Sequence, residues 1–115
     1  MTRITLLQSS DMLCGFTCEG HAGYGASGSD IVCAAISALT ATCVNALESV
    51  AGIRVKVRRR PKDAYLQALL PENLTVDQQH DAQVLLGFLK QGIDDLNAQY
   101  PQYVHLSIQE WRKPQ

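Results

Sequence analysis

Hydrophobic and polar positions follow two periods along this chain, and together they predict five strands and two helices. A period of two residues predicts a strand, and it occurs over residues 3–7, 12–19, 53–58, 65–69 and 103–108. A period of about 3.6 residues predicts an amphipathic helix, and it occurs from Ile31 to about Val50 and from Thr75 to Tyr100. The predicted order is therefore β-β-α-β-β-α-β.

This order and the apolar stripe on each helix favour an α+β fold. We expect a two-layer sandwich in which both helices pack on one face of a mixed or antiparallel sheet. The chain has 115 residues, of which 46% are hydrophobic, enough for one domain with a real core. Residues 1–115 are therefore expected to form a single domain.

The strand from Met12 to Glu19 is partly apolar on both faces, so we expect it in the centre of the sheet. Strict alternation places Cys14 and Cys18 beside Phe16 as core residues. The chain then enters a loop with four glycines within nine positions: Gly20, Gly23, Gly25 and Gly28.

Three interpretations of this loop are open. A phosphate cradle is disfavoured because the glycine spacing differs from the P-loop pattern and no lysine follows. A plain surface connection is the second. We favour the third, a flap hinged by glycines, because the loop lies between His21 and Cys33.

The two cysteines of the first predicted helix lie on different faces of it. Its apolar stripe is expected to face the sheet and contains Val32, Ile36, Leu39, Cys43, Leu47 and Val50. Cys33 falls outside that stripe, with Ser37 one turn further on. With Ser29 or Asp30 as N-cap, Cys33 would lie in the first turn, where unpaired N–H groups favour an anion such as a thiolate. Ala34, Ala38 and Ala41 form a small-residue face that would admit another element.

The charge and the cysteines indicate which partners and which cellular compartment to expect. The formal net charge is -1, so the whole molecule has no general affinity for nucleic acid. The N-terminus lacks a signal peptide's apolar segment, and no uninterrupted apolar run approaches membrane length. No cysteine pair has C-x-x-C spacing, so a structural zinc site is disfavoured. We expect a cytoplasmic protein with four reduced cysteines, no metal or cofactor and no membrane partner.

The loop and helix residues resemble a known family. Gly20-His21-Ala22-Gly23, followed by Gly28-Ser29-Asp30-Ile31-Val32-Cys33-Ala34-Ala35-Ile36-Ser37-Ala38-Leu39, is similar to the motif of the Prp ribosomal-processing cysteine proteases. The layout of the whole chain also resembles that family. Cys43 and the basic stretch after the helix are departures from it.

The resemblance implies a function and a site. His21 and Cys33 would be the catalytic pair, and Asp30 and Ser37 would support them. The family trims an N-terminal extension from the twenty-seventh protein of the large ribosomal subunit, cutting after two aromatic residues and before an alanine. The substrate loop would comprise Gly20, Gly23, Tyr24, Gly25 and Gly28. A homodimer is also implied.

Residues 53–58 alternate, with Ile53, Val55 and Val57 expected inward and Arg54, Lys56 and Arg58 outward. Arg59, Arg60 and Lys62 continue the charge. This stretch is either a solvated, edge-protecting sheet face or a surface that contacts the ribosome or RNA. The second interpretation gives an alternative function, a non-catalytic ribosome- or RNA-associated binding module that uses Arg54, Lys56, Arg58, Arg59 and Arg60.

A third hypothesis is a redox-sensing thiol at Cys33, for which the sequence indicates no resolving cysteine. In the second helix, Thr75 and Gln78 predict a capping box. Gly87 and Gly92 either weaken that helix or let another helix approach. His80 is expected on the surface and His105 on a sheet face.

Overall fold

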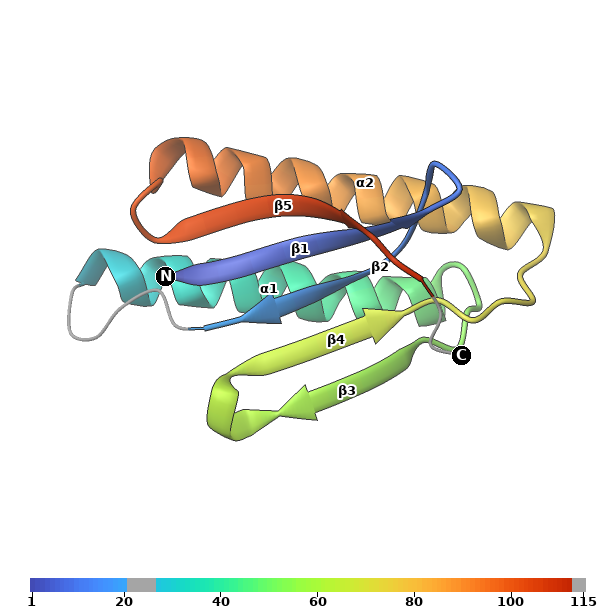
Figure 1. Cartoon of the computed structure of the whole chain (residues 1–115), viewed down its shortest axis with the longest axis horizontal. Helices are drawn as coiled ribbons and strands as arrows, with labels where there is room; N and C mark the ends of the chain where they lie inside the picture. The colour runs from blue at the N-terminus through green and yellow to red at the C-terminus, as the bar shows by residue number, and fades with distance from the viewer. Residues whose placement is uncertain (21–26, 113–115) are drawn as a thin grey trace.

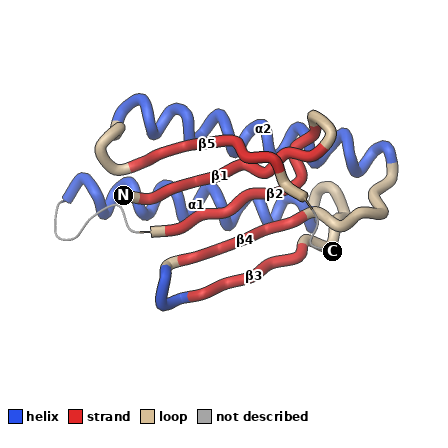
Figure 2. Tube along the Cα trace, viewed as in Figure 1, coloured by secondary structure: helices blue, strands red, loops and turns tan. Residues whose placement is uncertain are grey.

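A computed structural model describes residues 1–20 and 27–112 of the chain. It confirms the α+β two-layer sandwich and the order of the elements. Those elements are β1 (Thr2–Ser9), β2 (Met12–Glu19), α1 (Ser27–Ser49), β3 (Lys56–Arg60), the 3-10 turn η1 (Pro61–Asp63), β4 (Tyr65–Leu69), α2 (Val76–Gln99) and β5 (Val104–Glu110). Both helices lie on one face of the sheet, behind it in Figure 1 and Figure 2.

The five strands form one mixed sheet in the order β3-β4-β2-β1-β5. β1 and β5 are parallel, and the other neighbouring pairs are antiparallel. β2 is the middle strand, as its two partly apolar faces predicted. β3 and β5 are the edges.

The register identifies the face that carries the core. Ile4 pairs with Cys18 and Leu6 with Phe16, while Phe16 also pairs with Ala68. Ile4, Leu6, Phe16 and Ala68 are buried to within 1% exposure. α1 adds Val32, Ile36, Cys43 and Leu47 to this core, which confirms most of the predicted stripe. Val50 is an exception: α1 ends at Ser49, and Val50 is 72% exposed.

A bulge changes the prediction for Cys14. Leu7 pairs with Gly15 but Gln8 pairs with Leu13, so Cys14 is the extra residue. Past the bulge Leu13 packs against the core, whereas Cys14 is half-buried outside the core cluster. The expectation that Cys14 lies in the core is therefore wrong, and the expectation for Cys18, which does pack against the core, is confirmed.

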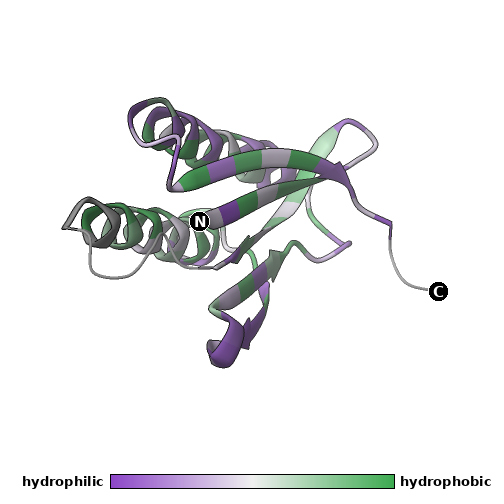
Figure 3. Ribbon diagram, turned by 60° about the vertical axis from the view of Figure 1, so that its left-hand side comes forward, coloured by the Kyte–Doolittle hydropathy of each residue, from purple (hydrophilic) through white to green (hydrophobic). Residues whose placement is uncertain are grey.

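The basic stretch is an exposed edge. β3 starts only at Lys56, and all five of its residues are exposed. Ile53 and Val55 are buried before the strand begins, as predicted, but Val57 is 37% exposed. Val57 pairs with the buried Ala68, so it lies on the inward face as predicted, and it is exposed because few neighbours cover the edge strand. Figure 3 shows the tip of the β3–β4 hairpin as strongly hydrophilic.

α1 is apolar along most of its length. By length and composition alone, Ile31–Ser49 would suffice to cross a membrane, with a mean hydropathy of 1.7. The expectation above concerned uninterrupted apolar runs, and Thr40, Asn45 and Glu48 interrupt this stretch. One third of the stretch is buried inside the protein, so core packing accounts for part of its composition.

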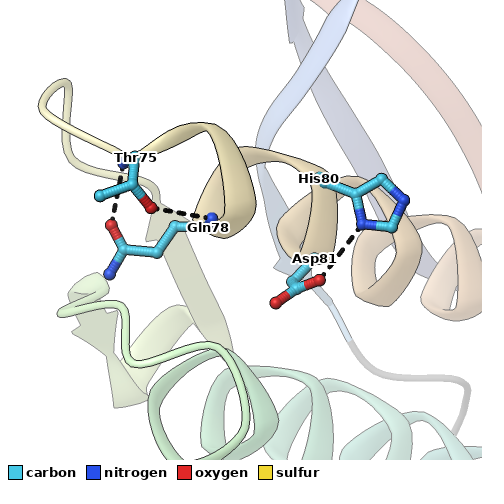
Figure 4. A network of polar contacts seen from close by, with 4 residues as sticks. All are labelled: Thr75, Gln78, His80 and Asp81. Atoms are coloured by element: carbon cyan, nitrogen blue, oxygen red, sulfur yellow. Dashed lines mark hydrogen bonds and ion pairs between the residues drawn. The ribbon is translucent and has the colours of Figure 1, made fainter.

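The capping box at the start of α2 is confirmed (Figure 4). Gln78 N–H donates to Thr75 Oγ1 and Thr75 N–H donates to Gln78 Oε1, both at 3.0 Å. Gln78 Nε2 also donates to the Gly52 carbonyl at 2.9 Å, which ties α2 to the segment after α1. His80 is exposed beside Asp81, as expected.

Candidate active site

The chain leaves the sheet toward the loop at Gly20. Its φ is +89°, a left-handed conformation that disfavours other residues. A Cβ at this position would lie 2.5 Å from the Met1 carbonyl oxygen. Glycine is therefore required here by both conformation and space, and it fixes the point from which the loop departs.

Several predicted site residues lie outside the described residues: His21, Gly23, Tyr24 and Gly25. Gly28 and Asp30 lie in the first turn of α1, which is all that is described of them. Their assignment to the site stays a prediction.

The start of α1 corrects one argument about Cys33. The helix begins at Ser27, so neither Ser29 nor Asp30 is its N-cap, and Cys33 is its seventh residue. Only the first four N–H groups of a helix lack helical partners. The expectation that Cys33 lies in the first turn is therefore wrong, and unpaired N–H groups of its own turn cannot stabilise its thiolate.

Cys33 and Ser37 do lie together, in a cavity of about 590 Å³. One wall is α1, which contributes residues about one turn apart. The other wall comes from the helix-facing side of the sheet and from the β3–β4 hairpin. The lining residues are Thr2, Cys18, Gly20, Cys33, Ile36, Ser37, Thr40, Ala41, Val44, Asn45, Arg59, Pro61, Ala64, Tyr65 and Leu66.

The cavity has the length of a short extended peptide. Cys33, Ser37, Ala41 and Asn45 follow one another at four-residue spacing on α1. At about 1.5 Å per residue, Cys33 and Asn45 are about 18 Å apart, which matches about five residues of extended chain. Apolar side chains (Ile36, Val44 and Leu66) and polar ones both line it. An extended peptide with mixed side chains would therefore fit this cavity.

Arg59 is the one charged residue among the described residues that line the cavity. The guanidinium of its neighbour Arg60 lies 4.0 Å from the centroid of the Tyr65 ring and 3.2 Å from the Asp63 carboxylate. The cation over the ring restrains Tyr65. Arg60 and Tyr65 pair with each other next to the Arg59–Leu66 pair, so the stacked ring lies on the opposite face of the sheet from the Arg59 side chain.

The other three cysteines are in settings that disfavour a thiolate. Burial raises the pKa of Cys18 to about 11, with smaller contributions from Cys33 and Glu19. Burial likewise raises the pKa of Cys43 to about 11. Burial also raises the pKa of Cys14, despite a backbone hydrogen bond that lowers it. These three remain thiols at neutral pH, and thiols are poor nucleophiles.

Residues of the sheet side were not predicted for the site. Arg59, Tyr65 and Cys18 come from three strands, and only the register brings them to one cavity. Leu66 pairs with both Arg59 and Cys18. Arg59, Leu66 and Cys18 therefore form one row that faces the helices. Asn45 shares the polar side of α1 with Ser37 and Thr40, and this is the signal by which the sequence could have indicated it.

Comparisons with known proteins find relatives that match over most of the chain. The sequence model of the family described as "Cysteine protease Prp" matches residues 1–105. The ribosomal processing cysteine protease Prp of Bacillus subtilis (strain 168) is 27% identical over 101 residues, covering 87% of this chain and 90% of that protein.

Solved structures share the fold. The protein SMU.848 from Streptococcus mutans superposes with a TM-score of 0.83 at 31% identity, covering 96% of each chain. The essential ribosomal processing protease Prp from Staphylococcus aureus, solved with a covalently linked product peptide, gives 0.80 at 20% identity. That match covers 95% of this chain and 100% of the other.

Proposed function

This chain belongs to the Prp family of ribosomal processing cysteine proteases, and from that premise we propose that it removes an N-terminal extension from the twenty-seventh protein of the large ribosomal subunit. The supporting observation is the cavity along α1, which has Cys33 at one end and room for an extended peptide. A precursor with a flexible N-terminal extension is a substrate of that shape.

The proposed mechanism uses Cys33 and His21. His21 takes the proton of the Cys33 thiol, and the thiolate attacks the scissile carbonyl carbon. The tetrahedral oxyanion is met by backbone N–H groups. As the C–N bond breaks, His21 protonates the leaving amine and an acyl thioester remains. Water, deprotonated by His21, then releases the new carboxylate and restores the thiol.

Ser37 and Asp30 are proposed to support this pair. Ser37 lies one turn after Cys33 and lines the same cavity, so its hydroxyl is placed to hydrogen-bond near the sulfur or the peptide. Asp30 would orient His21. Gly20, Gly23, Tyr24, Gly25 and Gly28 would belong to the segment that closes over the peptide.

The cleavage site is proposed to follow two aromatic residues and precede an alanine. Aromatic side chains pack well against apolar walls and beside other rings. Ile36, Val44 and Leu66 supply such apolar walls. The side after the scissile bond then needs room only for a small residue.

The surroundings of the enzyme are part of the proposal. We place it in the cytoplasm, associated with the ribosome through Arg54, Lys56 and Arg58–Arg60. A purely non-catalytic RNA-binding role no longer applies, because the family is one of proteases.

We also propose a homodimer, which would use the exposed face of α1 that contains Ala34 and Ala38. Sedimentation tests that contact by comparing the molecular mass in solution of Ala38→Glu with that of the wild type.

The central test is cleavage of a synthetic peptide that carries the extension and its junction. Cys33→Ala is expected to abolish cleavage, while Cys43→Ala, one cysteine further along the same helix but in the core, should retain it. Mass spectrometry of the products gives the cleaved bond. Undiminished cleavage by Cys33→Ala would remove the nucleophile assignment, and an uncut peptide with the wild type would remove the substrate assignment.

A further inference from the structure

Two cysteines share the candidate active-site cavity. Cys18 lies in the middle strand of the sheet, in the row of Ile4 and Leu66 that faces the helices. Cys33 lies on α1, the helix that forms the opposite wall. Both side chains line the cavity, and both pack against the same core cluster. The two thiols therefore face one space from opposite layers.

The remaining cysteines lie elsewhere, and all four are among the described residues. Cys43 is buried, with its sulfur 3.9 Å from the carbonyl oxygen of Leu85 on α2. Cys14 lines a second cavity together with Lys56 and Arg58. Cys18 is thus the one cysteine that shares the cavity of Cys33.

We propose that Cys18 is a resolving thiol for Cys33, so that a peroxide converts the pair to a disulfide across the cavity. In the first step the Cys33 thiolate attacks a peroxide oxygen, the O–O bond breaks, and Cys33 becomes a sulfenic acid while hydroxide leaves. In the second step the Cys18 sulfur attacks the sulfenic sulfur. An S–S bond forms, and the Cys18 proton and the sulfenic hydroxyl leave as water.

The environment of Cys18 suits this order of events. Burial, the neighbouring Cys33 and Glu19 raise the pKa of Cys18 to about 11, so it stays protonated at neutral pH and peroxide does not attack it first. In this proposal Cys33 therefore reacts with peroxide first, and Cys18 remains a thiol until Cys33 is oxidised.

The disulfide would have two consequences. It would occupy the Cys33 sulfur and bridge the walls between which the peptide binds, so cleavage would stop. It would also protect Cys33 from further oxidation to the sulfinic acid, which common dithiols do not reverse. The effect on cleavage rests on the proposed function, whereas the formation of the disulfide does not.

The test is thiol mapping of the intact protein after treatment with hydrogen peroxide. Of the four thiols of the chain, two are expected to resist alkylation. Non-reducing digestion should then yield one linked species, joining the peptide of Cys18 to that of Cys33. Dithiothreitol should restore all four thiols. Cys14→Ser and Cys43→Ser should give the same linked species as the wild type. A wild type that forms no such link, or that links Cys33 to another cysteine, overturns the proposal.

Cys18→Ala provides the second arm. Without a resolving thiol, Cys33 should gain two oxygen atoms, and dithiothreitol should not remove them. Recovery of an unmodified Cys33 in Cys18→Ala, equal to the wild type, would count against the proposal. The two proposals fail separately: a Cys18–Cys33 link together with undiminished cleavage by Cys33→Ala removes only the catalytic assignment. Inactive Cys33→Ala without any link removes only the redox assignment.

Discussion

Gly92 of α2 lies directly against Leu39 of α1. A Cβ at Gly92 would be 3.0 Å from Leu39 Cδ1 and 3.1 Å from Cδ2, closer than ordinary van der Waals contact. Gly87, on the same helix, has nothing within 4 Å of the equivalent position. Of the two roles expected for these glycines, close helix approach therefore applies to Gly92 alone.

Alanine at these two positions should act differently on stability. Gly87→Ala should raise the free energy of unfolding by about 0.5–1 kcal/mol, because glycine is the poorer helix former. Gly92→Ala should gain less or lose stability, because Leu39 must move aside. Urea unfolding of both variants measures the difference. Equal gains would mean that the helices are not in tight contact there.

Two hydrogen bonds of the Gln83 side chain connect α2 to the start of β2. It accepts from Leu13 N–H at 2.8 Å and donates to the Leu13 carbonyl at 2.7 Å, both beside the Cys14 bulge. Gln83→Ala should cost about 1–3 kcal/mol of unfolding free energy, because two backbone groups lose their partners. Gln91→Ala is the control, since Gln91 makes an exposed bond to Asp95 on the same helix and should change stability by less than about 0.5 kcal/mol.

The sequence predicted elements better than it predicted positions within them. β2 and β4 have the expected bounds because turn residues flank both of them. The Cys14 bulge depends on how β1 pairs with β2, which no local pattern encodes. Cys33 and Ser37 were predictable from one helix, whereas Arg59 and Tyr65 reach the cavity only through the register between β3, β4 and β2.

The start of α2 offers a comparison of two capping residues. Thr75→Ala removes one side of the capping box and should cost about 1 kcal/mol. Gln78→Ala should cost more, because Gln78 also donates to the Gly52 carbonyl and so joins α2 to the end of α1. A double-mutant cycle in urea should show coupling between the two residues. Additive effects would mean that the reciprocal bonds do not persist in solution.

Stability should fall in alkali because of the buried thiols. The pKa of Cys43 rises from an ordinary 9.0 to about 11 on burial, so above pH 9 the unfolded chain loses a proton that the folded chain retains. Unfolding is then favoured progressively between pH 9 and 11. Cys18 contributes in the same direction and window.

The variant Cys43→Ala isolates one of these thiols. It should be less stable at pH 8, because it leaves a small cavity, but its stability should decline less steeply between pH 9 and 10.5. Urea midpoints across this range measure the two slopes. Parallel curves for the wild type and the variant would show that the Cys43 thiol titrates alike in both states.

Arg58 and Arg59 allow a test of the cavity that holds net charge constant. They are neighbours on the edge strand, but Arg59 lines the cavity of Cys33 and Arg58 lines the other one. Replacing either with alanine removes one positive charge, so any long-range attraction of the substrate changes equally. Only Arg59→Ala also removes a side chain from the wall along which the peptide is proposed to lie. We expect its KM for the extension peptide to rise about 3–10-fold, as for the loss of one partly exposed polar contact, with Arg58→Ala close to the wild type. A rise of equal size in both variants would show that the basic edge acts through its overall field and that the peptide does not contact Arg59.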